Sequence, residues 1–181
     1  MRAINAWLYT TVDGVMEAPE NWVMPDEEMF ADQTAGYDAS DGLLIGHRTY
    51  EVFASSWPQR GSDVDNADWM NNTNKYVVSS TIRSPEWQNT TVLAGDVQRA
   101  VSRLKHEDGQ DITINGSSAL VRSLLTWGLL DELRLYQHPV VLGSGARLFG
   151  SMDSPVALEL SDFSTYDNGV VSLTYIPQQR Q

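Results

Sequence analysis

The amino-acid sequence predicts one α/β domain, residues 1–181, in which helices flank a mixed, mostly parallel sheet that ends in an antiparallel hairpin. Residues 111–136 have, in order, the patterns of a strand, a helix and a strand, and such a unit is normally a right-handed crossover between parallel strands. Residues 157–165 and 170–176 alternate around Asp-Asn-Gly at 167–169, which is a hairpin signal. With 181 residues, 41% of them hydrophobic, the chain can bury one sizeable core.

The composition limits the partners and the chemistry. A formal net charge of -12 and a pI near 4.4 oppose binding to nucleic acid or to an anionic membrane. An anionic cofactor stays possible, because salt screens charges beyond about 8 Å and local donors can then dominate. The absence of cysteine excludes disulfides, thiolate metal ligands and cysteine nucleophiles, and no metal site is expected. Asn5 interrupts the first apolar run before it is long enough for a secretory core, so we expect a cytoplasmic protein.

The N-terminal segment predicts a strand, a loop and a short acidic helix. Residues 3–11 are rich in strand formers and apolar enough for a central strand. Pro25 suits a first helical position, acidic residues follow at 26–28, and Gly36 is placed to stop the helix. These acidic residues need no functional explanation if they only stabilise the helix, because a negative charge at a helix N-terminus contributes about 0.3 to 1 kcal/mol. Alternatively, one of them faces a cleft beside Trp22 and supplies or relays a proton.

A second strand and helix meet at a glycine. Residues 41–46 predict a buried strand ending at Gly46, and His47, Arg48 and Thr49 open a helix whose apolar face includes Trp57. Because a helix dipole disfavours cations at its N-terminus, an anionic ligand would explain the His47–Arg48 pair. The alternative is that both side chains simply point into water.

The middle of the chain is less regular. The polar residues 58–74 predict the longest irregular surface loop. Residues 75–81 predict a strand that ends in hydroxyl side chains, and residues 91–94 predict a short strand. Asp96 is then expected to cap a helix with apolar residues at positions i, i+3, i+4 and i+7.

The strand–helix–strand unit contains a third glycine turn. The apolar period changes at residues 115–117, after which Ser117 or Ser118 can cap the helix and Gly128 can end it in a left-handed conformation. The turn at Gly116 would present unpaired backbone N–H groups, which form a ready anion site. The alternative is a tight turn with ordinary serine caps.

Together these runs resemble a known family. The relevant runs are TTVDG at 10–14, LLIGHRTYEVF at 43–53, KYVVSST at 75–81, INGSSALVRSLL at 114–125 and GLLDELRLYQHPVVLGSGARLF at 128–149. Their combination and order resemble the dihydrofolate-reductase-like superfamily, and more closely stand-alone relatives of the RibD C-terminal domain, the reductase part of riboflavin-biosynthesis deaminase-reductases. The resemblance covers nearly the whole chain. It implies that NADPH lies across the carboxyl ends of the strands.

The resemblance also implies roles for individual residues. It places Gly46 and Thr49 against the cofactor at one helix start, Ser79, Ser80 and Thr81 along the adenosine-ribose, and Gly116, Ser117 and Ser118 at the pyrophosphate. Superfamily members often have an arginine directly after the first of these glycines, where it meets the 2'-phosphate. Here His47 stands at that position and Arg48 follows, so NADH remains an alternative to NADPH.

The resemblance extends to a candidate proton path. Residues 22–27 are similar to the tryptophan, proline and acid arrangement of dihydrofolate reductases, which makes Glu27 the first candidate, with Asp26 and Asp13 as alternatives. No clear anchor for a folate glutamate tail is present. The predicted function is therefore NAD(P)H-dependent reduction of a small pteridine- or pyrimidine-like heterocycle or a related substrate. The alternative is a nucleotide-binding or interaction protein that keeps the fold without turnover.

We also expect a homodimer. The apolar residues of the C-terminal hairpin and of the segment 133–142 are too numerous for one short helix layer to cover. Closed twofold dimers are the commonest solution to such a surplus.

Overall fold

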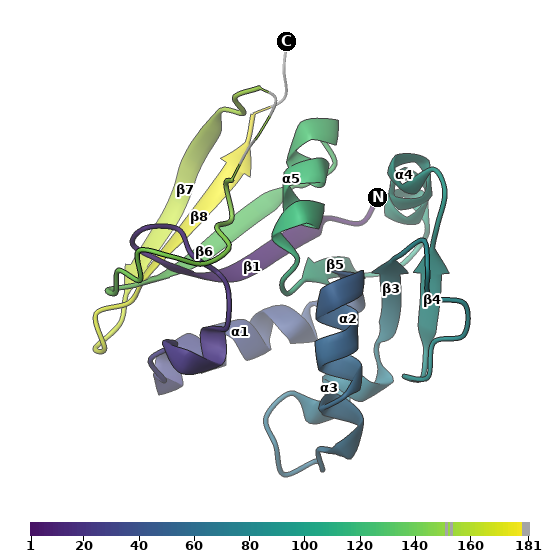
Figure 1. The fold of residues 1–181 in the computed structure, drawn as a ribbon, viewed down its shortest axis with the longest axis horizontal. Helices are drawn as coiled ribbons and strands as arrows, with labels where there is room; N and C mark the ends of the chain where they lie inside the picture. The colour runs from purple at the N-terminus through teal and green to yellow at the C-terminus, as the bar shows by residue number, and fades with distance from the viewer. Residues whose placement is uncertain (151, 153, 179–181) are drawn as a thin grey trace.

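The computed structural model describes residues 1–150, 152 and 154–178, which form one eight-stranded sheet with helices on its faces (Figure 1). The strands are β1 Ile4–Thr11, β2 Ser40–Gly46, β3 Asn74–Val78, β4 Thr90–Leu93, β5 Asp111–Ile114, β6 Glu132–His138, β7 Leu158–Thr165 and β8 Val171–Pro177. The helices are α1 Glu27–Asp38, α2 His47–Ala54, α3 Ala67–Asn72, α4 Val97–His106 and α5 Ser118–Trp127, with short 3-10 turns η1 Pro19–Asn21 and η2 Trp57–Gln59.

The sheet is mixed in the way that the sequence predicts. Its strand order is β4-β3-β2-β5-β1-β6-β8-β7. All pairs among β1 to β6 are parallel, whereas β8 is antiparallel to both β6 and β7. The C-terminal hairpin and the parallel orientation of β5 and β6 are therefore confirmed, and β1 lies between these two strands.

The central strand β1 divides the core into two layers. Ile4, Ala6 and Leu8 are buried on one face, where residues of α4 and α5 complete the largest apolar cluster. The alternate residues Trp7 and Tyr9 pack on the opposite face, which α1 covers. Because successive side chains of a strand point to opposite faces, one short segment supplies both layers.

Helix α1 differs from the prediction at both ends. Asp26 is its N-cap and accepts a hydrogen bond from the Met29 backbone N–H at 3.0 Å, so Pro25 lies outside the helix. Gly36 does not stop the helix, which continues to Asp38. A Cβ atom at Gly36 would overlap the Trp7 ring. The glycine is therefore explained by the close approach of α1 to β1, not by a C-cap.

The segment predicted to be irregular, residues 58–74, is partly helical. It contains the end of η2 and all of α3, and Met70 of α3 is buried. Trp57, expected on the apolar face of the helix that begins at His47, lies in η2 beyond the end of α2. Burial of Met70 against the sheet outweighs the polar composition of this stretch.

The face of the outer hairpin carries exposed apolar side chains, and we propose that it forms a homodimer. Leu160 is 49% exposed and Phe163 is 65% exposed, and they pair across the hairpin with Tyr175 and Leu173. Light scattering of the unaltered protein should give about twice the 20.2 kDa chain mass, and Phe163→Glu should give the chain mass. Val52→Glu on α2, where the side chain is 64% exposed, is the control and should leave the mass unchanged. An unaltered protein with the chain mass would contradict the proposal.

None of the helices in the described part of the chain is both long enough and apolar enough to cross a membrane.

Candidate functional site

The predicted binding residues lie along one edge of the sheet. Because β1 to β6 are parallel, their carboxyl ends share an edge, and ligands of open α/β sheets bind there. The adjacent strands β3, β2 and β5 bring three predicted segments to this edge: Ser79–Thr81, Gly46–Thr49 and Gly116–Ser118.

The turns after β2 and β5 touch each other. A Cβ atom at Gly46 would overlap the Ser117 hydroxyl, and one at Gly116 would lie 3.1 Å from the Thr49 methyl group. Gly116 also has φ = 102°, which L side chains rarely adopt. Glycine at both positions therefore lets the N-termini of α2 and α5 lie side by side.

These two helix starts differ from those of α1 and α4. Asp26 and Asp96 cap α1 and α4 with side-chain hydrogen bonds to backbone N–H groups. In the described chain the N-caps of α2 and α5, Gly46 and Ser117, make no such bond. The sequence offered Ser117 or Ser118 as the cap. Ser117 occupies the N-cap position, but its side chain makes no capping hydrogen bond, because the residue has φ = 69° and its hydroxyl lies against Gly46; Ser118 is the first residue of the helix. Two neighbouring uncapped N-termini, each with the positive end of a helix dipole, favour an anion such as a pyrophosphate.

His47 is held by side chains from two elements. Its Nδ1 lies 2.8 Å from Ser79 Oγ and 3.3 Å from Thr81 Oγ1, and its Nε2 lies 3.1 Å from a Glu51 carboxylate oxygen. The Ser79 oxygen also accepts hydrogen bonds from the Thr81 and Ile82 backbone N–H groups, both at 3.1 Å. Sequence reasoning missed Glu51, although its i, i+4 spacing from His47 on α2 was a usable signal.

A hollow of about 400 Å³ opens beside this network. It is lined by His47, Val78, Ser79, Ser80, Thr81, Leu93, Ala94, Gly95 and Val97. The predicted hydroxyl residues and His47 thus come together, and the β4–α4 turn completes the wall. No residue of that turn was predicted to take part in binding. Arg48 is exposed on α2 and is not part of the lining.

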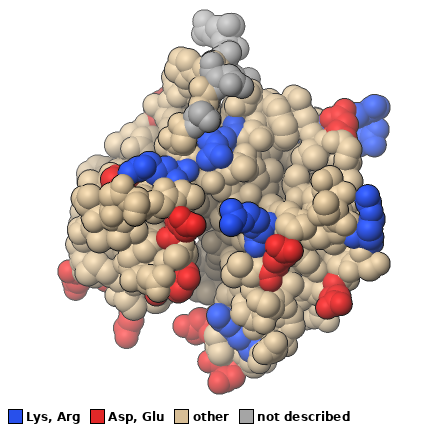
Figure 2. All heavy atoms as spheres, in the orientation of Figure 1, with Lys and Arg blue, Asp and Glu red and all other residues tan. Residues whose placement is uncertain are grey.

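On the face that Figure 2 shows, acidic and basic side chains are interspersed around a central depression. No three histidine, aspartate or glutamate side chains in the described ranges are grouped so that they could hold a metal ion.

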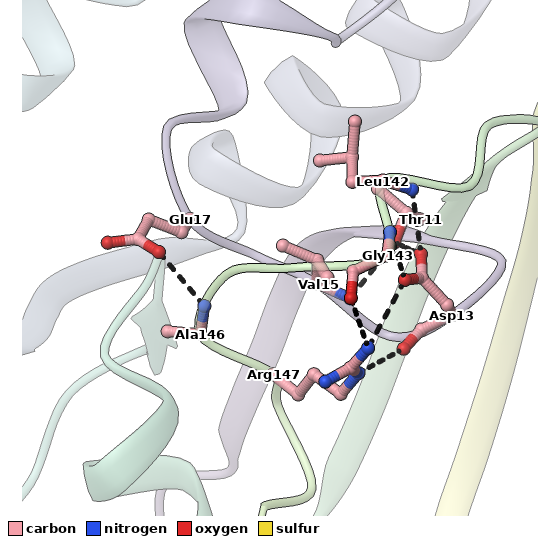
Figure 3. A network of polar contacts seen from close by, with 8 residues as sticks. All are labelled: Thr11, Asp13, Val15, Glu17, Leu142, Gly143, Ala146 and Arg147. Carbon is pink, nitrogen blue, oxygen red and sulfur yellow. Dashed lines mark hydrogen bonds and ion pairs between the residues drawn. The ribbon is translucent and has the colours of Figure 1, made fainter.

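Asp13 joins the loop after β1 to the loop after β6 (Figure 3). Its carboxylate accepts hydrogen bonds from the Thr11 hydroxyl at 2.6 Å and from the Leu142 and Gly143 backbone N–H groups at 3.3 and 2.9 Å. Arg147 lies 3.4 Å from the same carboxylate and donates to the Asp13 carbonyl at 2.9 Å. The Thr11 hydroxyl, supported by the two N–H groups, outweighs desolvation and lowers the pKa of Asp13 to about 2. Asp13 is therefore ionised at neutral pH.

We predict that the contacts of the Asp13 carboxylate stabilise the protein less in acid than at neutral pH. The folded-state pKa of Asp13 is about 2 and its ordinary value is 3.8, so its stabilising contribution is complete above pH 3.8 and is lost as the pH falls towards 2. The difference in free energy of unfolding between the unaltered protein and Asp13→Asn should be constant from about pH 5 to 7 and should shrink below about pH 4. A difference that does not change with pH would contradict this role.

The segment before α1 is anchored over the end of β6. Trp22 is buried edge-on against His138, with ring centroids 5.5 Å apart, and its indole N–H donates to the Glu17 carbonyl at 2.8 Å. His138 is fully buried, its Nδ1 accepts from the Met24 N–H at 3.3 Å, and burial lowers its pKa. Sequence reasoning identified His138 only as a strand end.

The two acidic residues at the start of α1 differ in environment. Asp26 uses its carboxylate as the helix cap, whereas Glu27 is exposed in the first turn. Asp13 and Asp26 thus have structural partners. Of the three predicted proton-path residues, Glu27 is therefore the most accessible to a substrate.

Comparison with known proteins identifies the family. Residues 2–172 match the model of the RibD C-terminal domain. The chain belongs to this family. It is 30% identical over 176 residues to the uncharacterized protein YyaP of Bacillus subtilis, a match that covers 93% of this chain and 91% of YyaP.

Solved structures of low identity share the fold of this RibD C-terminal domain. A putative riboflavin biosynthesis protein from Shewanella sp. PV-4 superposes with a TM-score of 0.79 at 18% identity, covering 98% of this chain and 99% of the other. A diaminohydroxyphosphoribosylaminopyrimidine deaminase/5-amino-6-(5-phosphoribosylamino)uracil reductase from Thermotoga maritima superposes with a TM-score of 0.71 at 13% identity. That match covers 98% of this chain but only 57% of the Thermotoga protein.

In this RibD C-terminal domain, the residues predicted to bind the cofactor lie at one edge of the sheet. His47 and Ser79–Thr81 line the hollow, whereas Arg48 and the residues of the two glycine turns, Gly46, Thr49 and Gly116–Ser118, do not. The acids predicted for the proton path do not form one group. Asp13 belongs to the loop after β1, while Asp26 and Glu27 begin α1.

Proposed function

We propose that this protein is an NAD(P)H-dependent reductase that transfers hydride to a small pteridine- or pyrimidine-like heterocycle or a related substrate. The observation that carries the proposal is the pair of uncapped helix N-termini, α2 and α5, side by side at the carboxyl edge of the sheet. Two dipoles and their free N–H groups suit the pyrophosphate of a dinucleotide, even in a chain of net charge -12.

The sheet order supports a path for an extended dinucleotide. The hollow lies at β3 and β4, the paired glycine turns lie at β2 and β5, and β1 comes next. Four strand spacings from β4 to β1 amount to about 19 Å. An adenosine in the hollow and a pyrophosphate at the glycine turns would therefore direct the reactive end towards the ends of β1 and β6.

The chain's own contribution is orientation and a proton. A reduced nicotinamide would supply the hydride when bound. The helix N-termini and the glycine turns would fix its phosphates, so that the reacting groups meet in a constant geometry. Glu27, with Asp26 as a weaker candidate, would deliver a proton or order a water molecule at the substrate, whereas Asp13, ionised at neutral pH, would only order a water molecule.

A substrate-free titration tests the proposal. Intrinsic tryptophan fluorescence should change saturably when NADPH or NADH is added, because this chain contains six tryptophans. Consumption of the reduced nucleotide should then follow when small pteridines or pyrimidines are supplied. Failure of both nucleotides to bind at millimolar concentration would overturn the proposal.

We predict that Gly116→Ala weakens nucleotide binding about tenfold or more. A side chain there is strained at φ = 102° and would press on Thr49, which separates the two helix starts. Gly128→Ala is the matched control, because Gly128 ends the same helix with φ = 67° and has open space around it. Fluorescence titration should show near-normal affinity for Gly128→Ala. Equal affinities for both variants would remove Gly116 from the site.

The second candidate is a nucleotide-binding protein without turnover. Burial of Trp22 against His138 favours it, because an indole in that place reduces the room for a substrate near the end of β6. Saturable nucleotide binding with no consumption across pterin, pyrimidine and quinone panels would support this candidate over the reductase.

A further inference from the structure

The hollow has no cationic wall. Four of its nine lining residues are apolar (Val78, Leu93, Ala94 and Val97), three carry hydroxyl groups (Ser79, Ser80 and Thr81), and Gly95 and His47 complete it. Within the described chain the lining therefore contains neither lysine nor arginine. Hydroxyl groups and apolar side chains suit a neutral sugar and a flat base, whereas a phosphate dianion is best bound by cations.

The hydrogen bonds of His47 leave it no free donor. The Ser79 oxygen already accepts two backbone N–H groups, so its single proton is available for His47 Nδ1 at 2.8 Å. Nδ1 is then an acceptor, and the ring proton sits on Nε2, which faces the Glu51 carboxylate at 3.1 Å. A phosphate approaching this ring would have to displace Ser79 or approach the charge of Glu51.

Arg48 does not supply a positive charge to the hollow. Successive residues of a helix point about 100° apart, so Arg48 and His47 occupy different sides of α2. Arg48 is exposed, and the hollow is lined by His47 and not by Arg48. The net charge of -12 adds a general repulsion to any extra phosphate.

We infer that the adenosine end of the site takes a ribose without a 2'-phosphate, and that the His47–Ser79–Glu51 network is the determinant of this specificity. NADH therefore binds at least as tightly as NADPH. This inference rests on the proposed function, because it assigns the hollow to the adenosine of the same dinucleotide.

The test compares two nucleotides on the unaltered protein and on matched variants. Fluorescence titration should give a Kd for NADH equal to or below that for NADPH. In competition with NADH, 5'-AMP should be at least as effective as adenosine 2',5'-bisphosphate, a readout of the adenosine end alone. His47→Arg adds a permanent positive charge beside Ser80 and Thr81. It should lower the Kd for NADPH by about tenfold or more and change the Kd for NADH by less than about threefold.

Two further variants separate the possible determinants. Glu51→Gln removes the carboxylate without adding a cation. It should raise the affinity for NADPH relative to that for NADH, as His47→Arg does, but by a smaller factor. Arg48→Ala should leave the ratio of the two affinities unchanged. NADPH binding tenfold tighter than NADH in the unaltered protein, or a loss of NADPH alone in Arg48→Ala, would overturn this inference and leave the reductase proposal intact. Failure of both nucleotides to bind would overturn both.

Discussion

Replacing Gly36 with alanine should lower the free energy of unfolding by about 3 kcal/mol, although alanine is the better helix former. The added Cβ would overlap the Trp7 ring, so α1 would have to move away from β1 or the indole would have to leave its position. The Trp7 ring also contacts Tyr37 of α1 at a centroid distance of 5.9 Å, and its indole N–H donates to the Glu132 carboxylate at 3.4 Å. Overpacking of this kind costs about 1 to 3 kcal/mol and more when backbone is involved, against a gain in helix propensity of about 1 kcal/mol. Thermal or urea unfolding measures the difference.

The same substitution should change sign when the indole is absent. In a Trp7→Leu background the space beside Gly36 is open, and Gly36→Ala should then stabilise the protein by up to about 1 kcal/mol. Destabilisation of equal size in both backgrounds would show that the Trp7 contact is not the cause.

Replacing Lys75 with methionine should cost about 3 kcal/mol. The Lys75 side chain is fully buried, and its ammonium group donates to the carbonyl oxygens of Met70, Asn71 and Thr73 at 3.0, 3.1 and 2.9 Å. Met70 and Asn71 lie in the last turn of α3 and Thr73 is its C-cap, so the charge complements the helix dipole there. The Asn71 carbonyl also accepts from the Gln88 side-chain amide at 2.9 Å. Methionine removes the ammonium donor, and an acceptor left unpaired costs about 1 to 3 kcal/mol, partly offset because no charge is then buried.

A surface cation provides the control for Lys75. Lys75 Nζ lies 4.4 Å from the centroid of the Trp87 ring, and the exposed Arg60 lies 4.2 Å from the centroid of the Trp57 ring. Arg60→Met removes a similar cation–π contact without a buried carbonyl cluster and should change the free energy of unfolding by less than about 1 kcal/mol. Chemical denaturation that gave equal losses for the two variants would assign the Lys75 effect to the ring instead of the carbonyls.

The elements that the sequence predicted best depend on neighbours along the chain. The alternation of β1, the Asp96 cap of α4 and the Asp-Asn-Gly hairpin turn between β7 and β8 each depend on a few consecutive residues. The same holds for the three strand-end turns at Gly46, Ser79 and Gly116. Because parallel strands share a carboxyl edge, predicting these turns was enough to predict that their residues meet.

Patterns of neighbouring residues did not predict the roles of residues that contact distant parts of the chain. Gly36 has the signature of a helix stop, but Trp7 of β1 requires it in the helix interior. Ser117 has the signature of a cap, but it turns towards Gly46. The Asp13 carboxylate accepts from the Gly143 N–H, 130 residues away, a contact that no local pattern indicates.

The strand–turn–helix units with glycine at 46 and 116 follow from the change in apolar period along the chain, which is a local property. Which side chains contact one another at these turns depends on how the strands assemble. His47 Nδ1 lies 2.8 Å from Ser79 Oγ because β2 and β3 are neighbours in this sheet. The order of the strands is set by the crossovers between them, which no local period encodes. For this reason the sequence predicted which turns share an edge of the sheet, whereas the set of residues that line the hollow depended on the assembled sheet.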